Sequence, residues 1–74
     1  MLVHVPLRVA ILNELASIKK KSKTKWTSGT DIERLAEKLG FKPSNGARRC
    51  RELAAKGHIV RAETEDGYVQ YKAL

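Results

Sequence analysis

The sequence is poor in the features that secreted and membrane proteins use. Cys50 is its only cysteine, so no intramolecular disulfide can form and nothing indicates an oxidising compartment. The longest candidate for a membrane span, residues 9–12, has four consecutive apolar residues, whereas a spanning helix needs roughly 20. Most of the nearby positive charge, in residues 19–25, lies after this segment, whereas a signal peptide carries it before the apolar run. We therefore expect a soluble, intracellular protein, cytoplasmic or nucleoid-associated, with no membrane partner.

Patterns for catalysis and metal binding are also missing. Neither His4 nor His58 has partners at metal-ligand spacing, and a structural zinc site needs about four ligands. The sequence has no paired carboxylates, phosphate-binding glycine loop or catalytic triad. Cys50 falls on the apolar side of a predicted helix, which favours a small buried hydrophobe over a nucleophile. We expect no enzymatic activity, metal, cofactor or small-molecule ligand.

Negative charge is scarce relative to positive charge. The 74 residues suffice for one domain spanning residues 1–74, and they include 15 Lys and Arg against 8 Asp and Glu, for a net charge of +7. The excess lies in residues 1–29, with six basic residues and one acidic, and in residues 41–57, with five and one. The segments 30–40 and 58–74 are each net negative by one. A net charge of this size indicates a polyanionic partner, and of the two candidates, nucleic acid and an acidic membrane surface, we expect nucleic acid.

The first predicted helix spans residues 6–19 and leads into a basic connector. Apolar residues recur there at spacings of four, four and three, which places them on one helical face: Leu7, Ile11, Leu15 and Ile18. In the connector, residues 20–29, Trp26 either packs in a short edge strand or is left exposed for a partner. Burial is the favoured interpretation.

A second helix is predicted over residues 30–39. Thr30 and Glu33 have the spacing of a capping box, in which each side chain satisfies a free backbone N–H at the helix start. Gly40 marks the end, because glycine tolerates the left-handed conformation common there.

The third predicted helix, residues 44–56, has a thin apolar seam and a cationic outer face. The seam consists of Ala47, Cys50, Leu53 and Ala54. Gly46, which costs about 1 kcal/mol relative to alanine in a helix, either permits a close backbone approach or softens the first turn.

The chain ends in a predicted β-hairpin over residues 58–72. Asp66-Gly67 is a strong signal for a two-residue turn. A turn centred there pairs Glu65 with Tyr68 and Ala62 with Tyr71. In that register Val60, Ala62, Val69 and Tyr71 share one face, and Arg61, Glu63, Gln70 and Lys72 share the other. We expect the hairpin to pair with the strand near Trp26.

This order of elements, from about residue 6 to residue 72, resembles the winged helix-turn-helix DNA-binding domains. Residues 32–41 lead through residues 42–44 into the third helix, and the most specific piece is Leu53-x-x-x-Gly57-x-Ile59, where that helix enters the wing. The resemblance implies an α+β fold of three helices with a C-terminal hairpin wing and a short third strand near Trp26. It also implies a sequence-specific binder of double-stranded DNA that acts as a transcriptional regulator.

In that family the third helix enters the major groove and the wing contacts the backbone or the minor groove. The resemblance therefore assigns base reading to Ser44, Asn45, Arg48 and Arg49. Arginine can bond guanine at O6 and N7, and asparagine can bond adenine at N6 and N7. Phosphate contacts are expected from Lys23, Lys25, Ser28, Thr30, Lys42, Arg51, Arg61 and Lys72.

Two features depart from the family pattern: Gly46 near the start of the third helix, and the wing tip. The wing tip, residues 63–66, is acidic where a phosphate-gripping wing should be basic, so we do not expect the tip to lie against DNA. Two alternatives remain open: a winged-helix protein–protein interaction module, or a low-specificity DNA binder in replication or nucleoid organisation. We expect a monomer, or a weak homodimer on DNA.

Overall fold

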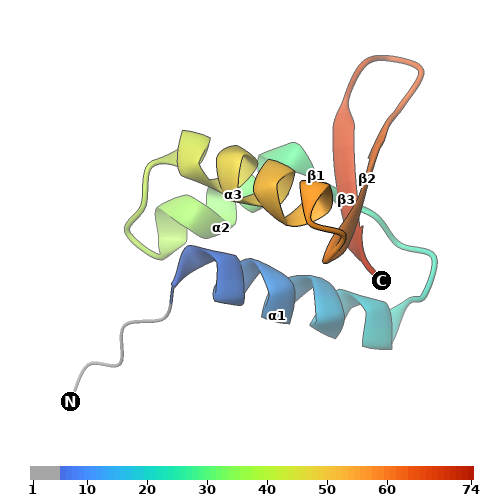
Figure 1. Cartoon of the computed structure of the whole chain (residues 1–74), viewed down its shortest axis with the longest axis horizontal. Helices are drawn as coiled ribbons and strands as arrows, with labels where there is room; N and C mark the ends of the chain where they lie inside the picture. Colours follow the sequence, from blue (N-terminus) through green and yellow to red (C-terminus); the bar gives the residue numbers. More distant parts are fainter. Residues whose placement is uncertain (1–5) are drawn as a thin grey trace.

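The computed structural model describes residues 6–74 (Figure 1), so His4 lies outside the described residues. In chain order the elements are α1 (Leu7–Lys21), β1 (Thr27–Ser28), α2 (Gly29–Lys38), α3 (Pro43–Ala55), β2 (Ile59–Glu63) and β3 (Val69–Ala73). Within these residues the fold is α+β, with three helices and a three-stranded antiparallel sheet, as predicted. None of these three helices combines the length and the apolar character that crossing a lipid bilayer requires.

The hydrophobic core lies where the three helices meet one face of the sheet. From α1 it receives Leu7, Ile11 and Leu15, which share one helical face as predicted, while Ile18 is only half-buried. The other buried hydrophobic residues are Ile32, Ala36, Cys50, Leu53, Ile59 and Tyr71. Burying one large aliphatic side chain contributes about 1.5–3 kcal/mol. In Figure 1, α1 lies along one side of the α2–α3 pair and the hairpin extends away from all three helices.

The start of α2 corrects the predicted capping box. Ser28, in extended conformation at the end of β1, is the N-cap, and its Oγ accepts a hydrogen bond from the Asp31 N–H at 3.2 Å. Thr30 already lies inside the first turn and does not cap. The capping-box prediction was wrong because the sheet pairing of β1 fixes Ser28 as the last extended residue, so the helix begins at Gly29.

The end of α2 is as predicted. Gly40 follows the C-cap with a φ of 88°, and its N–H donates to the Glu37 carbonyl at 3.0 Å. The Phe41 N–H donates back to the Ala36 carbonyl at 2.9 Å. These two bonds close the helix and bring the partly buried Phe41 side chain onto the core. The chain then enters α3 at Pro43.

The hairpin register differs from the predicted one by one residue. β2 and β3 pair Arg61 with Tyr71 and Glu63 with Val69. The Thr64 N–H donates to the Tyr68 carbonyl at 2.8 Å, and the Gly67 N–H donates to the Thr64 carbonyl at 3.0 Å. The loop therefore has three residues, and Gly67, with a φ of 86°, adopts its left-handed position. The two-residue turn was the wrong prediction because the same Asp-Gly pair also suits this longer loop.

The one-residue shift changes which side chains share a face of the sheet. Tyr71 and Ile59 are both buried on the inner face, and Arg61 lies on that same side of the hairpin. Lys72 lies on the other face, where its Nζ is 4.5 Å from the centre of the Trp26 ring. The predicted grouping of Arg61 with Lys72 was therefore wrong.

The sheet order is β1-β3-β2, so the predicted strand near Trp26 is confirmed. It covers Thr27 and Ser28, which pair with Tyr71 and Gln70 of β3. Trp26 precedes the strand and is half-buried. Because β1 runs directly into α2, this pairing holds the N-terminus of α2 beside the hairpin.

Candidate nucleic-acid interface

The outward face of α3 is cationic. Gly46, Cys50 and Leu53 are buried, and at about 100° per residue the opposite side of the helix carries Ser44, Arg48 and, toward one flank, Arg51. These three side chains are exposed. Within residues 6–74 neither Arg48 nor Arg51 has an ion-pair partner. Both guanidinium groups therefore remain available to an anion.

A groove of ≈ 320 Å³ lies beside this face, between the start of α2, one flank of α3 and the hairpin. From α2 and its N-cap it is lined by Ser28, Gly29, Thr30 and Glu33, from α3 by Ala47 and Arg51, and from the hairpin by Arg61, Gly67, Tyr68, Val69 and Tyr71. The free backbone N–H groups at the start of α2 add partial positive charge to the two arginines, and Glu33 offsets part of it. The groove thus has the chemistry to hold a phosphate group.

Arg61 reaches this groove because of the observed register. It lies opposite Tyr71 and forms an ion pair with Glu63, with 3.3 Å between Nη2 and Oε1. Exposed pairs of this kind are worth about 0–1 kcal/mol, so a phosphate can replace the carboxylate at little cost. In the predicted register, Arg61 would share a face with Lys72 and lie away from the buried side of the sheet.

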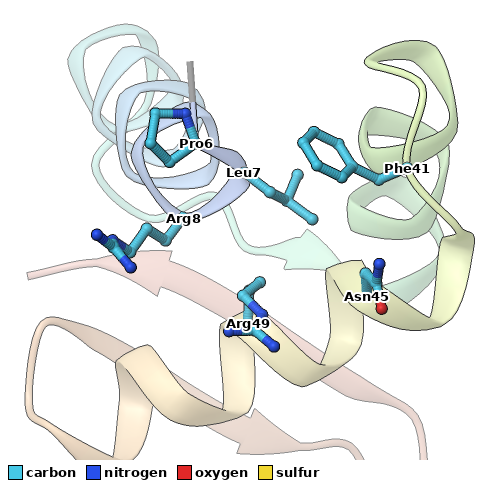
Figure 2. A pocket seen from close by; sticks show the side chains of 6 residues that line it. All are labelled: Pro6, Leu7, Arg8, Phe41, Asn45 and Arg49. Atoms are coloured by element: carbon cyan, nitrogen blue, oxygen red, sulfur yellow. The ribbon is translucent and has the colours of Figure 1, made fainter. Parts of the chain in front are cut away.

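Two of the four predicted base-reading residues lie on the other flank of α3. Asn45 and Arg49 line a hollow of ≈ 300 Å³ together with Pro6, Leu7, Arg8 and Phe41. Figure 2 shows Leu7 pointing toward the Phe41 ring, with Arg8 extending to the left from α1 and Arg49 lying below it on α3. The Arg49 Nη1 also donates to the Glu52 Oε2 at 2.9 Å.

The sequence did not single out Arg8 as a site residue. It lies near the start of α1, about forty positions before Arg49 in the chain, and no motif links the two. Only the packing of α1 against α3 brings these two cations into one hollow. The one sequence feature that pointed to Arg8 was its contribution to the positive charge of residues 1–29.

The predicted phosphate-binding residues fall into separate groups. Ser28, Thr30, Arg51 and Arg61 line one groove, and Lys42 is the exposed N-cap residue of α3. Lys23 lies beside the end of β3, and Lys25 lies beside Trp26 and Lys38. With Lys72 over the Trp26 ring, these three lysines lie outside the α3 groove.

Cys50 contributes packing and no visible chemistry. It is fully buried, as predicted, and burial raises the pKa of its thiol to about 12, so the thiolate is disfavoured at neutral pH. In the part of the chain that the structure describes, no three His, Cys, Asp or Glu side chains gather as a metal site. Comparison with known proteins found no matching family model, no matching curated protein and no matching solved structure.

Proposed function

We propose that this chain is a small winged helix-turn-helix protein that binds double-stranded DNA sequence-specifically and regulates transcription. The helix, short strand, helix, helix and hairpin follow one another in the order of that fold, and α2 and α3 are joined by a four-residue connection, residues 39–42. In this proposal α3 is the recognition helix and the hairpin is the wing.

The observation that carries the proposal is the exposed, unpaired Arg48 at the centre of the outward face of α3. A helix of about 10–12 Å diameter fits a major groove about 12 Å wide. Arg48 and Ser44 would then point at base edges, where an arginine bonds guanine bidentately. A solvated helix face would more often pair its arginines with neighbouring carboxylates, as Arg49 does with Glu52.

The two flanks of α3 match the two phosphate backbones that border a major groove. On one side Arg51 and Arg61 lie in the groove with the N-terminus of α2. On the other side Asn45 and Arg49 lie in the hollow with Arg8. We therefore reassign Asn45 and Arg49 to backbone contact, and keep Ser44 and Arg48 as base readers. Backbone contacts supply affinity and register, and base contacts supply specificity.

The decisive experiment is selection of bound duplexes from a random library, followed by titration of the selected duplex and a scrambled one. We expect an enriched motif, and we expect Arg48→Ala to cost about 1–3 kcal/mol on the selected duplex with a smaller loss on the scrambled one. Lys38→Ala, which removes an exposed cation from α2, is the matched control and should leave discrimination unchanged. If Arg48→Ala bound the selected duplex as tightly as the wild type does, and likewise the scrambled duplex, the assigned reading face would be refuted.

Two other outcomes correspond to other functions. Tight duplex binding without an enriched motif would indicate a low-specificity binder in replication or nucleoid organisation. No duplex binding even at low salt would indicate a protein–protein interaction module, for which the acidic, exposed wing tip is the specific supporting observation. In each case we expect binding without a catalytic step.

A further inference from the structure

The tip of the hairpin presents two free carboxylates and an aromatic ring. Glu65 and Asp66 are exposed, and within residues 6–74 neither has an ion-pair partner. The Tyr68 ring, which also lines the groove beside α3, is 72% exposed. The loop is ordered by its own bonds, including one from the Tyr68 N–H to the Thr64 Oγ1 at 3.1 Å. The tip is therefore a preformed acidic projection with one apolar anchor.

The opposite end of the hairpin carries a surface of complementary chemistry. A hollow of ≈ 370 Å³ is lined by Ala16, Lys19, Lys20, Lys23, Ala73 and Leu74. Its apolar part comes from the alanines and from Leu74, which is 67% exposed, and its rim comes from three lysines. The Lys19 Nζ already donates to the Leu74 carbonyl, and within residues 6–74 neither Lys20 nor Lys23 has an ion-pair partner. No carboxylate side chain lines this lysine-rimmed hollow.

The tip and the lysine-rimmed hollow cannot meet within one copy. They lie at the two ends of β3 (Val69–Ala73), and five extended residues span roughly 17 Å. Figure 1 shows the tip far from the helices, with the C-terminal end of the strand beside α1. A contact between the two surfaces therefore requires two copies. Since it uses a different patch on each copy, it is heterologous and can extend into a chain of copies.

We propose that the acidic tip of one copy docks into the lysine-rimmed hollow of a second copy, so that the protein associates head to tail. Glu65 and Asp66 face Lys20 and Lys23, and Tyr68 covers the apolar surface of Ala73 and Leu74. This role accounts for the negative charge of a wing tip that has no use against phosphate. It goes beyond the proposed function, because it needs no DNA.

Charge sets the strength of this contact. Each copy carries a net charge of +7, so two free copies repel each other at long range. At about 0.1 M salt this repulsion is screened beyond roughly 10 Å, whereas charges in contact still interact. We therefore expect weak association in free solution that declines at high salt. Bound DNA would neutralise the excess charge and strengthen the association.

The test is analytical ultracentrifugation of the full chain without DNA, over a wide concentration range. The wild type should show a weight-average mass that rises above 8.3 kDa with concentration. Glu65→Lys/Asp66→Lys makes both surfaces basic, and Lys20→Glu/Lys23→Glu makes both acidic, so each variant alone should remain a monomer. A mixture of the two variants should associate at least as well as the wild type, since opposite charges then meet at every contact.

Two comparisons separate this contact from a general effect of charge. Lys20→Glu/Lys23→Glu lowers the net charge by four units from +7, so net charge alone predicts stronger association, and the proposal predicts weaker. The control variant Glu14→Lys/Glu37→Lys makes the same charge change as the tip variant at exposed sites outside both surfaces. If this control loses association as fully as the tip variant, the proposal fails. It fails also if the wild type stays monomeric throughout, or if mixing the two charge-reversed variants restores nothing.

Discussion

Gly46 of α3 lies directly against the backbone of Ile32 in α2. A Cβ at position 46 would be 2.9 Å from the Ile32 carbonyl oxygen and 3.1 Å from its Cγ2. Of the two explanations for a glycine at this position, the structure therefore supports close approach of the two helices. The absence of a side chain lets α2 and α3 pack at this point, and it thereby fixes which face of α3 points outward.

We expect Gly46→Ala to destabilise the fold, by up to about 2 kcal/mol. Alanine is the better helix former by about 1 kcal/mol, but overpacking against a backbone atom costs about 1–3 kcal/mol. Urea unfolding, followed by tryptophan fluorescence, measures the difference. Gly29→Ala is the matched control, because its Cβ would lie at an ordinary 3.5 Å from the Val69 carbonyl. A Gly46→Ala protein as stable as the wild type would show that the two helices can separate without cost.

Arg51 and Lys25 should differ in their effect on the salt dependence of DNA binding. Arg51 lies in the groove beside α3, whereas Lys25 lies beside Trp26 and Lys38. Arg51→Ala should weaken binding to all duplexes alike and lower the slope of log affinity against log salt by about 1. Lys25→Ala should leave the slope unchanged. An equal loss for both would show that the connector also contacts phosphate.

Lys72 should contribute to stability and not to DNA affinity. Its ammonium group lies 4.5 Å from the centre of the Trp26 ring, and exposed cation–π contacts contribute about 0.5–1 kcal/mol. Lys72→Ala should therefore lower the free energy of unfolding by about that amount, measured by thermal or urea unfolding. Its affinity for duplex DNA and its salt slope should match the wild type. If Lys72→Ala instead lowered the slope of log affinity against log salt by about 1, that result would support the predicted contact of Lys72 with phosphate.

Cys50 should make stability depend on pH in the alkaline range. The thiol has an ordinary pKa of 9.0, and burial raises it to about 12 in the folded chain. Between pH 9 and pH 12 the unfolded state therefore binds fewer protons than the native state, so stability falls as pH rises, by at most about 1.4 kcal/mol per pH unit. Below pH 9 the thiol adds no pH dependence.

Comparison with Cys50→Ala isolates this effect, because lysines and tyrosines titrate in the same range in both proteins. The variant should be less stable than the wild type below pH 9, and its stability should fall less steeply above it. Parallel decline of the two proteins across the alkaline range would contradict the raised pKa. A thiol reagent supplies a second readout: it should label Cys50 in the native protein only at the rate of unfolding.

Local patterns predicted the elements well because each helix carries its own signals. The apolar spacing of α1, Gly40 after α2 and the hairpin turn residues all act within a few positions of the chain. The errors occurred where two local solutions compete. Ser28 and Thr30 can each cap a helix, and Asp66-Gly67 suits both a two-residue and a three-residue loop. Pairing of β1 with β3 decided the first competition, and pairing of β2 with β3 decided the second.

The sequence predicted which kinds of residue make up the site, but not how they are arranged. The sequence placed an excess of arginine on one helix, and the family resemblance assigned Ser44, Asn45, Arg48 and Arg49 together to base reading. The separation of Asn45 and Arg49 from Ser44 and Arg48 comes from the packing of α1 near Phe41, because this packing occupies one flank of α3. Likewise, the shift of one residue in the hairpin moved Arg61 to the side of Arg51 and left Lys72 over Trp26.

The sequence by itself determined the α+β class, the order of elements, the buried Cys50 and a net charge of +7 concentrated in two segments. Tertiary structure alone decided which of those charges share a surface. Periodicity and turn chemistry are short-range and can be read along the chain. The placement of Arg8 and Arg49 along one hollow, and of Arg51 and Arg61 along one groove, depends on packing between segments distant in sequence. In the hairpin, a register shift of one residue reverses the face that a side chain occupies.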